Sequence, residues 1–313
     1  MYAGIIAGIT WAIDTVILGI VLGSTSFISD TEAILLAPLV STFLHDLFSA
    51  VYCAIFNLLK GNWSKFIEAL RSKNGRFIAL ASLIGGPVGM SGYVLAVANL
   101  GSSLAAVGSA IYPAVGSILA HFFLKEKLPL YRFVFMLIAL CGIYGLSYSP
   151  QQQIVNLGLG VLGIMMCGFG WGIEAVIIAK CVKDDSVTNE VALQIRQSTS
   201  TLIYGLVILP IVKGYDLVLS LFEHDLNIVM MISVAALFGT VSYLFYYKAI
   251  TKIGASKAMA LNSTYAAWAV IISTVILKDY SLLNSVTIVC TMIVIVFGVL
   301  AGTDLKELLH SKE

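Results

Sequence analysis

ANLGSSLAAVGSAIYPAVGSILAHFFLKEKL (residues 98–128) and TKIGASKAMALNSTYAAWAVIISTVILKDYS (residues 251–281) are two copies of one segment. A constant offset of 153 residues aligns them and pairs Tyr112 with Tyr265. The loop that opens the first copy carries no Lys or Arg, whereas the second copy opens with Lys252. Duplicated apolar segments in oppositely charged settings are typical of inverted repeats in membranes, an architecture found mostly in secondary transporters.

The composition agrees with a membrane protein. Hydrophobic residues make up 59% of the 313 residues, charged residues make up 11%, and the mean hydropathy is +0.96. A soluble domain of this size could not cover so apolar a core with so little polar surface. The net charge of +1 excludes a nucleic-acid partner on electrostatic grounds. The five cysteines are scattered, so no metal site or cofactor is expected, and the composition predicts no oligomeric state.

Ten apolar stretches are long enough to cross a bilayer, which takes about 20 residues. Most of the loops between them are short, so successive helices are expected to be antiparallel neighbours. The predicted spans are residues 3–23, 33–59, 77–98, 102–124, 130–148, 156–181, 189–212, 227–250, 255–277 and 283–301.

Basic residues lie overwhelmingly on one side of these spans. With the N-terminus in the cytoplasm, fifteen of the eighteen Lys and Arg are cytoplasmic, and only Lys213 and Lys278 lie outside. The positive-inside rule then places both termini in the cytoplasm. Residues 60–76 belong to the basic side and predict an amphipathic helix on the membrane surface. Each half, 1–150 and 151–313, contains five spans. An odd number of crossings makes the second half start on the opposite side of the membrane, so the two halves are inverted. The predicted fold is all-α, with ten transmembrane helices.

Each half begins with a helix that carries a Trp and, three residues later, a carboxylate. GITWAID contains Trp11 and Asp14, and GFGWGIE contains Trp171 and Glu174. This spacing puts both side chains on one helix face. A carboxylate near mid-membrane is costly unless it is paired or faces water, so Asp14 and Glu174 are candidates for substrate binding or ion coupling.

Three other polar residues interrupt the spans and are candidates for coupling: Arg196 and the adjacent His45 and Asp46. Each has a structural alternative. Glu174 and Arg196 could form a structural ion pair, and a His–Asp hydrogen bond can simply tie helices together.

Aromatic side chains concentrate at the depth of the carboxylates. Trp and Tyr usually belong to the membrane interface, which suits Trp63 and is an alternative for Tyr246 and Tyr247. Aromatic faces beside carboxylates in a dry cavity favour an organic cation, since each face contributes about 0.5–2 kcal/mol. The aromatic candidates for this site are Trp11, Trp171, Tyr112, Tyr243, Tyr265 and Trp268.

Small residues fill the third and fourth spans and predict close helix packing. Pro113 removes a backbone hydrogen bond in the fourth span, beside Tyr112. Two interpretations are open for it: a kink at a binding cavity, or a kink within packed helices.

Several segments resemble a known group of transporters. Ten spans in a five-plus-five inverted repeat resemble the drug/metabolite transporter superfamily of the EamA type. The similarity is greater to one branch of that superfamily, the LicB choline permeases. It covers most of the chain and is carried by GGPVGMSGYVLAVANLGSSLAAVGSAIYPAVGSILAHFFLKEKL, GFGWGIEAVI, ALQIRQSTS, SYLFYY and LNSTYAAWAV.

The resemblance implies import of choline, coupled to protons, through a bacterial cytoplasmic membrane. It also implies that Trp11, Trp171 and Tyr243 cage the trimethylammonium group, with an outer group nearby consisting of Tyr112, Tyr265 and Trp268. One departure concerns Asp14, because that branch has a small residue at this position. An added carboxylate here would alter substrate preference or coupling.

Two other functions are compatible with parts of the pattern. An exporter of amino acids or drugs would keep the repeat without needing the two Trp–carboxylate pairs. A membrane-embedded enzyme would need a nucleophile–base set or a metal cluster, but the sequence has no HExxH, no GxSxG and no grouping of its four histidines. The sequence therefore favours a transporter of an organic cation.

Overall fold

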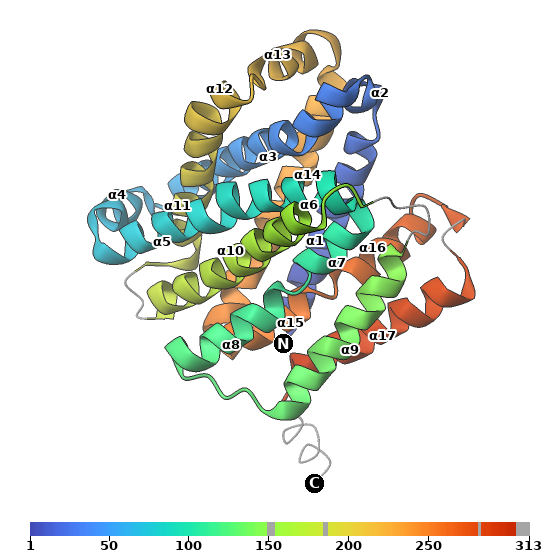
Figure 1. Cartoon of the computed structure of the whole chain (residues 1–313). Coiled ribbons are helices and arrows are strands. Elements are labelled where there is room, and N and C mark those ends of the chain that lie inside the picture. Colours follow the sequence, from blue (N-terminus) through green and yellow to red (C-terminus); the bar gives the residue numbers. More distant parts are fainter. Residues whose placement is uncertain (149–153, 184–186, 281–282, 305–313) are drawn as a thin grey trace.

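The computed structural model describes residues 1–148, 154–183, 187–280 and 283–304, and the predicted boundary between residues 150 and 151 lies outside these ranges. Figure 1 shows long helices packed side by side. The helices of the first half are α1 (Tyr2–Leu22), α2 (Thr25–Ile28), α3 (Thr31–Leu59), α4 (Trp63–Arg71), α5 (Lys73–Leu83), the π-helix η1 (Ile84–Val88), α6 (Gly89–Leu100), α7 (Ser102–Ser109), α8 (Tyr112–Leu124) and α9 (Leu130–Ser147).

The second half also consists of helices, but its π-helix lies in the second span and not in the third. Its helices are α10 (Leu157–Lys183), α11 (Asn189–Ile203), the π-helix η2 (Tyr204–Ile208), α12 (Leu209–Ile211), α13 (Tyr215–His224), α14 (Leu226–Ile253), α15 (Ala255–Asn262), α16 (Tyr265–Val275) and α17 (Ser285–Ala301).

The apolar helices confirm the predicted class of fold. Within the described ranges, eight helices are long and apolar enough to cross a membrane. A ninth crossing is added when Asn189–Ile211 and Tyr215–His224, bent by 106°, are taken as one span. The shorter apolar helix α17, of 17 residues, lies in the tenth predicted range. The chain is therefore an all-helical, multi-span membrane protein.

Equivalent helices of the two halves pack reciprocally. α9 lies along α17, which Figure 1 shows at one edge of the molecule, and α3 lies along α11. α1 packs against α14, and their counterparts α10 and α6 pack in the same way. Such reciprocal contacts are what a twofold relation between duplicated units produces. The first helix of each half is thus packed into the other half, and any central cavity takes its walls from both.

The fourth span of each half is broken at the matching place. α7 ends at Ser109 and α8 begins at Tyr112, while α15 ends at Asn262 and α16 begins at Tyr265. Pro113 accounts for the first break because it has no N–H to continue the helix. The second copy breaks without a proline.

Hydroxyl groups give additional hydrogen bonds to backbone carbonyls at these breaks. Ser109 Oγ donates to the carbonyl of Ala106 at 2.8 Å. In the second copy, Thr264 Oγ1 donates to the carbonyl of Leu261 at 2.7 Å, and the neighbouring Ser263 bonds in the same manner. In a membrane interior a hydroxyl must also find a partner, and at these breaks it finds one in the carbonyl of the preceding turn.

Glycines allow the turns that precede the broken spans. Gly101 and Gly254 have φ of 80° and 89°, in the region that residues with a Cβ rarely adopt. Their ψ values, 167° and 160°, also match. The two turns are therefore the same backbone structure, made once in each half.

Two connections differ from the prediction. The amphipathic helix expected over residues 60–76 is present only as α4, and the third span begins early, at Lys73, because Ser72 caps it by accepting from the N–H of Gly75 at 3.0 Å. The loop expected over residues 213–226 instead contains the helix α13. Its apolar face packs on α3 and α14, which explains why it folds.

Candidate functional site

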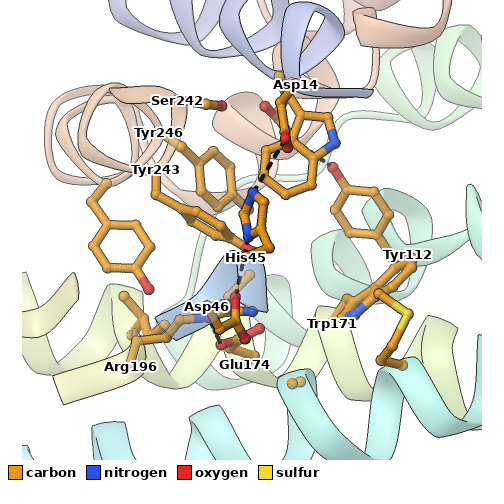
Figure 2. Close-up of a pocket in the computed structure, with 18 of the residues that line it drawn as sticks. Asp14, His45, Asp46, Tyr112, Trp171, Glu174, Arg196, Ser242, Tyr243 and Tyr246 are labelled. Carbon is orange, nitrogen blue, oxygen red and sulfur yellow. Dashed lines mark hydrogen bonds and ion pairs between the residues drawn. The ribbon is translucent and has the colours of Figure 1, made fainter. Parts of the chain in front are cut away.

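A cavity of about 190 Å³ lies between the two halves. It is walled by the first helix of each half together with α3, α11, α14 and the broken fourth spans (Figure 2). Its lining residues include Trp11, Asp14, Leu18, Thr42, His45, Asp46, Gly85, Gly86, Met90, Tyr112, Trp171, Glu174, Arg196, Ser242, Tyr243, Tyr246, Tyr247, Asn262 and Tyr265. All five coupling candidates and five of the six aromatic candidates therefore meet in one place.

The five charged or titratable candidates form one connected network. Figure 2 shows Asp14, His45 and Asp46 joined in sequence, with Arg196 and Glu174 at the far end. All five side chains are buried. Three carboxylates face a single guanidinium, so with a neutral His45 the network carries two net negative charges. A cavity with a field of this sign favours a cation.

Arg196 is the fixed positive charge of the network. Its Nε donates to Glu174 Oε1 at 3.0 Å, and its Nη1 donates to Gln197 Oε1 at 2.6 Å and lies 3.4 Å from Asp46 Oδ1. Its guanidinium also lies over the ring of Tyr243, 4.6 Å from the centroid. The ion pair considered as the structural alternative for Glu174 is therefore present.

His45 links the remaining carboxylates. Its Nε2 lies 3.2 Å from Asp14 Oδ1, and its Nδ1 lies 3.4 Å from Asp46 Oδ1. Asp46 is held on its other oxygen by Ser200, whose hydroxyl donates at 2.6 Å. Both nitrogens of the imidazole therefore face carboxylate oxygens, across the space between α1 and α3.

Three glycines leave room for these side chains. A Cβ on Gly85 would lie 2.0 Å from Glu174 Oε2, and one on Gly86 would lie 2.7 Å from Ser200 Oγ. A Cβ on Gly239 of α14 would lie 2.7 Å from His45 Nε2. The sequence predicts that such glycines serve close helix packing. Gly92 and Gly163 do so, because they let α6 and α10 approach each other. At the cavity, glycine instead admits charged groups.

Aromatic rings form perpendicular walls on two sides of the cavity. Trp11 packs edge to face on Tyr243, with centroids 5.2 Å apart and planes at 84°. Trp171 packs edge to face on Tyr112, with centroids 5.9 Å apart and planes at 87°. In each pair the Trp and the Tyr come from different halves of the chain. Perpendicular rings present faces to a common volume, which is the geometry of an aromatic box for a cation.

Tyr112 and Tyr265, the first residues after the helix breaks, both line the cavity. Asn262, the last residue before the second break, donates from Nδ2 to Tyr112 Oη at 3.1 Å. The kink at Pro113 is therefore at the cavity and not only within packed helices. This bond joins the two broken spans across the site.

The positions of three aromatic residues differ from expectation. Trp268 lies one turn beyond Tyr265 on α16 and does not line the cavity. Tyr246 and Tyr247, for which the membrane interface was an alternative, are 8% and 1% exposed and line the cavity. The repeated aromatic residues of SYLFYY indicate a place in the cavity for Tyr246 and Tyr247. Because both lie close to a predicted helix end, the sequence alone also allowed a place at the membrane interface.

Comparison with known proteins places this arrangement in a class of transporters. The EamA-like transporter family matches residues 1–148 and residues 158–301, so the chain belongs to that family. It is a secondary transporter of the bilayer and not an enzyme.

Two individual proteins are similar to it. Protein LicB from Haemophilus influenzae is 31% identical over 192 residues, which are 61% of this chain and 64% of the relative. The match thus spans less than two thirds of that relative. A crystal structure with 14% sequence identity superposes with a TM-score of 0.70 over 98% of this chain and 97% of its own. At that identity the likeness shows the fold alone.

Proposed function

We propose that this protein imports choline or a similar quaternary amine across the bacterial cytoplasmic membrane, by alternating access and together with protons. The observation that carries the proposal is the combination of perpendicular aromatic walls with a net negative cavity. A quaternary ammonium has no N–H to donate, so ring faces and the electrostatic field must hold it. The resemblance to the LicB choline permeases supports choline as the substrate.

In this proposal Trp11, Trp171 and Tyr243 form the box, and Tyr112 and Tyr265 border it. Glu174 supplies negative charge one helical turn from Trp171 while remaining bonded to Arg196. Trp268 has no direct role, because it does not reach the cavity in this conformation.

Export of amino acids is the alternative, and the network argues against it. A carboxylate substrate would need a cation with free donors. Arg196 Nε and Nη1 are already bonded to Glu174, Asp46 and Gln197, and the guanidinium lies over Tyr243, so among the described residues Nη2 alone is left to meet a carboxylate. An amino acid would bring a carboxylate, beside its own ammonium group, into a cavity that is already negative, and this carries an electrostatic cost that choline does not incur.

Binding can be tested with a pair of molecules that differ only in charge. Choline and 3,3-dimethylbutan-1-ol have the same shape, but the second has carbon in place of the cationic nitrogen. Thermal unfolding of the purified protein would be followed with each. Choline at about 100 times its Kd should add about 2.7 kcal/mol of stability, and the neutral alcohol should add far less. Equal stabilisation by both compounds would exclude the cation site.

Direction is tested separately in cells that express the protein. Labelled choline should accumulate inside, and labelled alanine loaded into the same cells should leave no faster than from cells without the protein. Accelerated alanine loss without choline uptake would instead establish the exporter.

A further inference from the structure

We propose that the coupled proton is carried by the Asp14–His45 pair, and that Glu174 is not its carrier. This inference rests on the proposed function, since a coupled proton requires a transported substrate. Asp14 and His45 come from α1 and α3, and their closest atoms, Oδ1 and Nε2, are 3.2 Å apart. Both side chains are buried and line the cavity.

One extra proton at this pair would satisfy its hydrogen-bond contacts. Both imidazole nitrogens of His45 face carboxylate oxygens, of Asp14 and of Asp46. A neutral imidazole has one N–H and can donate to only one of them. Arg196 and the hydroxyl of Ser200 hold Asp46 as a carboxylate, so the proton that satisfies both contacts lies on the imidazole or on Asp14, within the pair. The pair thus has the contacts of a proton site, next to the proposed substrate site.

The surrounding charges identify this pair as the group that can exchange its proton. The groups that face it are Asp46 from α3, Arg196 from α11, Glu174 from α10 and the phenol of Tyr243 from α14. From α15 and α16, which also pack on α1, only uncharged Asn262 and Tyr265 line the cavity. Arg196 is a permanent cation and lies within bonding distance of Asp46 and Glu174.

Asp14 differs from the other two carboxylates in its partner. Among the residues that the structure describes, His45 is the only ion-pair partner of Asp14. Protonating Glu174 would deprive Arg196 of its 3.0 Å partner, whereas a proton entering or leaving the Asp14–His45 pair leaves the Arg196 bonds in place. Proton exchange is therefore least disruptive at the pair.

Charge balance then couples the proton to the substrate. With the pair unprotonated the network has two net negative charges, and with one proton it has one. One proton and one monovalent cation together make the site neutral. Burying a site with uncompensated charge is costly, so occlusion is favoured when both are bound. The expected stoichiometry is one proton with each choline, moving in the same direction.

The experiment compares two transport modes in liposomes that contain the purified protein. Counterflow exchanges labelled for unlabelled choline and needs no net proton movement, so it reports a folded and functional carrier. Accumulation driven by a pH gradient, with the membrane voltage clamped at zero, requires coupling. One unit of pH should drive about tenfold accumulation for a single coupled proton. A pH-sensitive dye inside the liposomes records choline-evoked proton entry.

The test variants are Asp14→Asn and His45→Gln. The matched controls are Thr15→Val and Ser41→Ala, which change polar residues on the same helices that bond only to their own helix backbone. We expect both test variants to keep counterflow but to lose accumulation and proton entry, while both controls retain them. Coupled accumulation in Asp14→Asn and His45→Gln would overturn the proposal, as would proton movement opposite to choline in the unaltered protein.

A failure of the proposed function would look different. If the unaltered protein shows no choline counterflow, choline transport itself is wrong and the coupling proposal fails with it. If the unaltered protein shows choline counterflow but no choline-evoked proton entry, choline transport stands, and both its coupling to protons and the assignment to Asp14 and His45 are rejected.

Discussion

Trp11 and Trp171 would each contribute a ring to the proposed box from matched positions in the two halves. Replacing either with Leu keeps apolar bulk and removes the π face. Because one desolvated cation–π contact is worth roughly 1–2 kcal/mol, choline affinity should fall about tenfold in each variant. Trp63→Leu is the control, since Trp63 lies on α4 and does not line the cavity. Calorimetry would measure the Kd, and unchanged values in both cavity variants would disprove the box.

Glu174 and Arg196 are expected to stabilise the protein as a pair. Removing one partner of a buried ion pair leaves an uncompensated charge and typically costs about 3–5 kcal/mol. Glu174→Gln and Arg196→Gln should therefore each lower the melting temperature strongly, and the double variant should recover part of the loss.

An exposed ion pair provides the comparison for this prediction. Lys60 and Glu190 are 3.1 Å apart, but their side chains are 49% and 26% exposed. Lys60→Gln should therefore change stability by less than about 1 kcal/mol. Glu174→Gln with the melting temperature of the unaltered protein would show that the buried pair is not structural.

Asp304, just beyond α17, predicts a pH effect outside the membrane. The hydrogen bond from Lys257 holds the pKa of Asp304 below its ordinary value of 3.8, and the guanidinium of Arg132 acts in the same direction. A carboxylate with a lowered pKa stabilises the fold above its unfolded pKa, and this contribution is lost as pH falls through the folded value. The melting temperature of Asp304→Asn should therefore be lower than that of the unaltered protein at neutral pH, and the difference should vanish in strong acid. A difference that grows in acid would contradict the assignment.

At the level of elements, α6 and α10 approach so closely that a methyl group would not fit. A Cβ on Gly163 would lie 2.4 Å from the carbonyl oxygen of Gly92 and 2.6 Å from the amide nitrogen of Ala96. These are backbone atoms and cannot move aside, so Gly163→Ala should lower stability by several kcal/mol, above the usual range of about 1–3 kcal/mol for overpacking.

A glycine with open space supplies the matched control. Gly19 on α1 has no atom within 4 Å of its would-be Cβ. Gly19→Ala should be neutral or stabilising by up to about 1 kcal/mol, because alanine favours the helix. The melting temperatures of the two variants, compared in the same detergent, check the prediction. Equal values would show that α6 and α10 can separate freely.

The sequence predicts that the first helix of each half lines the cavity, because a Trp and a carboxylate three residues apart must share a helix face. It reached the first broken span through Pro113, but not the second, which breaks at Ser263 and Thr264. Ser and Thr occur in intact membrane helices, and only the tertiary contacts decide whether their hydroxyls replace backbone bonds. Similarly, residues near a helix end, such as Tyr247, show their burial only once neighbouring helices are in place.

For the whole molecule, the inverted orientation predicts opposite accessibility of two matched residues. Lys125 and Lys278 are related by the offset of 153, are both exposed, and have nearly equal φ of 57° and 56°. In a variant without native cysteines, a membrane-impermeant thiol reagent should label Lys278→Cys in sealed cells. It should label Lys125→Cys only after lysis, and labelling of both from outside would refute the inversion.

The position of Arg196 over Tyr243 has a kinetic consequence for the transport cycle. The ring of Tyr243, which belongs to the proposed box, already holds a resident cation. An arriving ammonium therefore exchanges one cation–ring contact for another, and much of the gain from Tyr243 cancels. Such a built-in competitor shortens the dwell time of the cargo, since differences in affinity appear mostly in the off-rate. A transporter must release its substrate in every cycle, so we expect Arg196 to weaken binding and to speed substrate release.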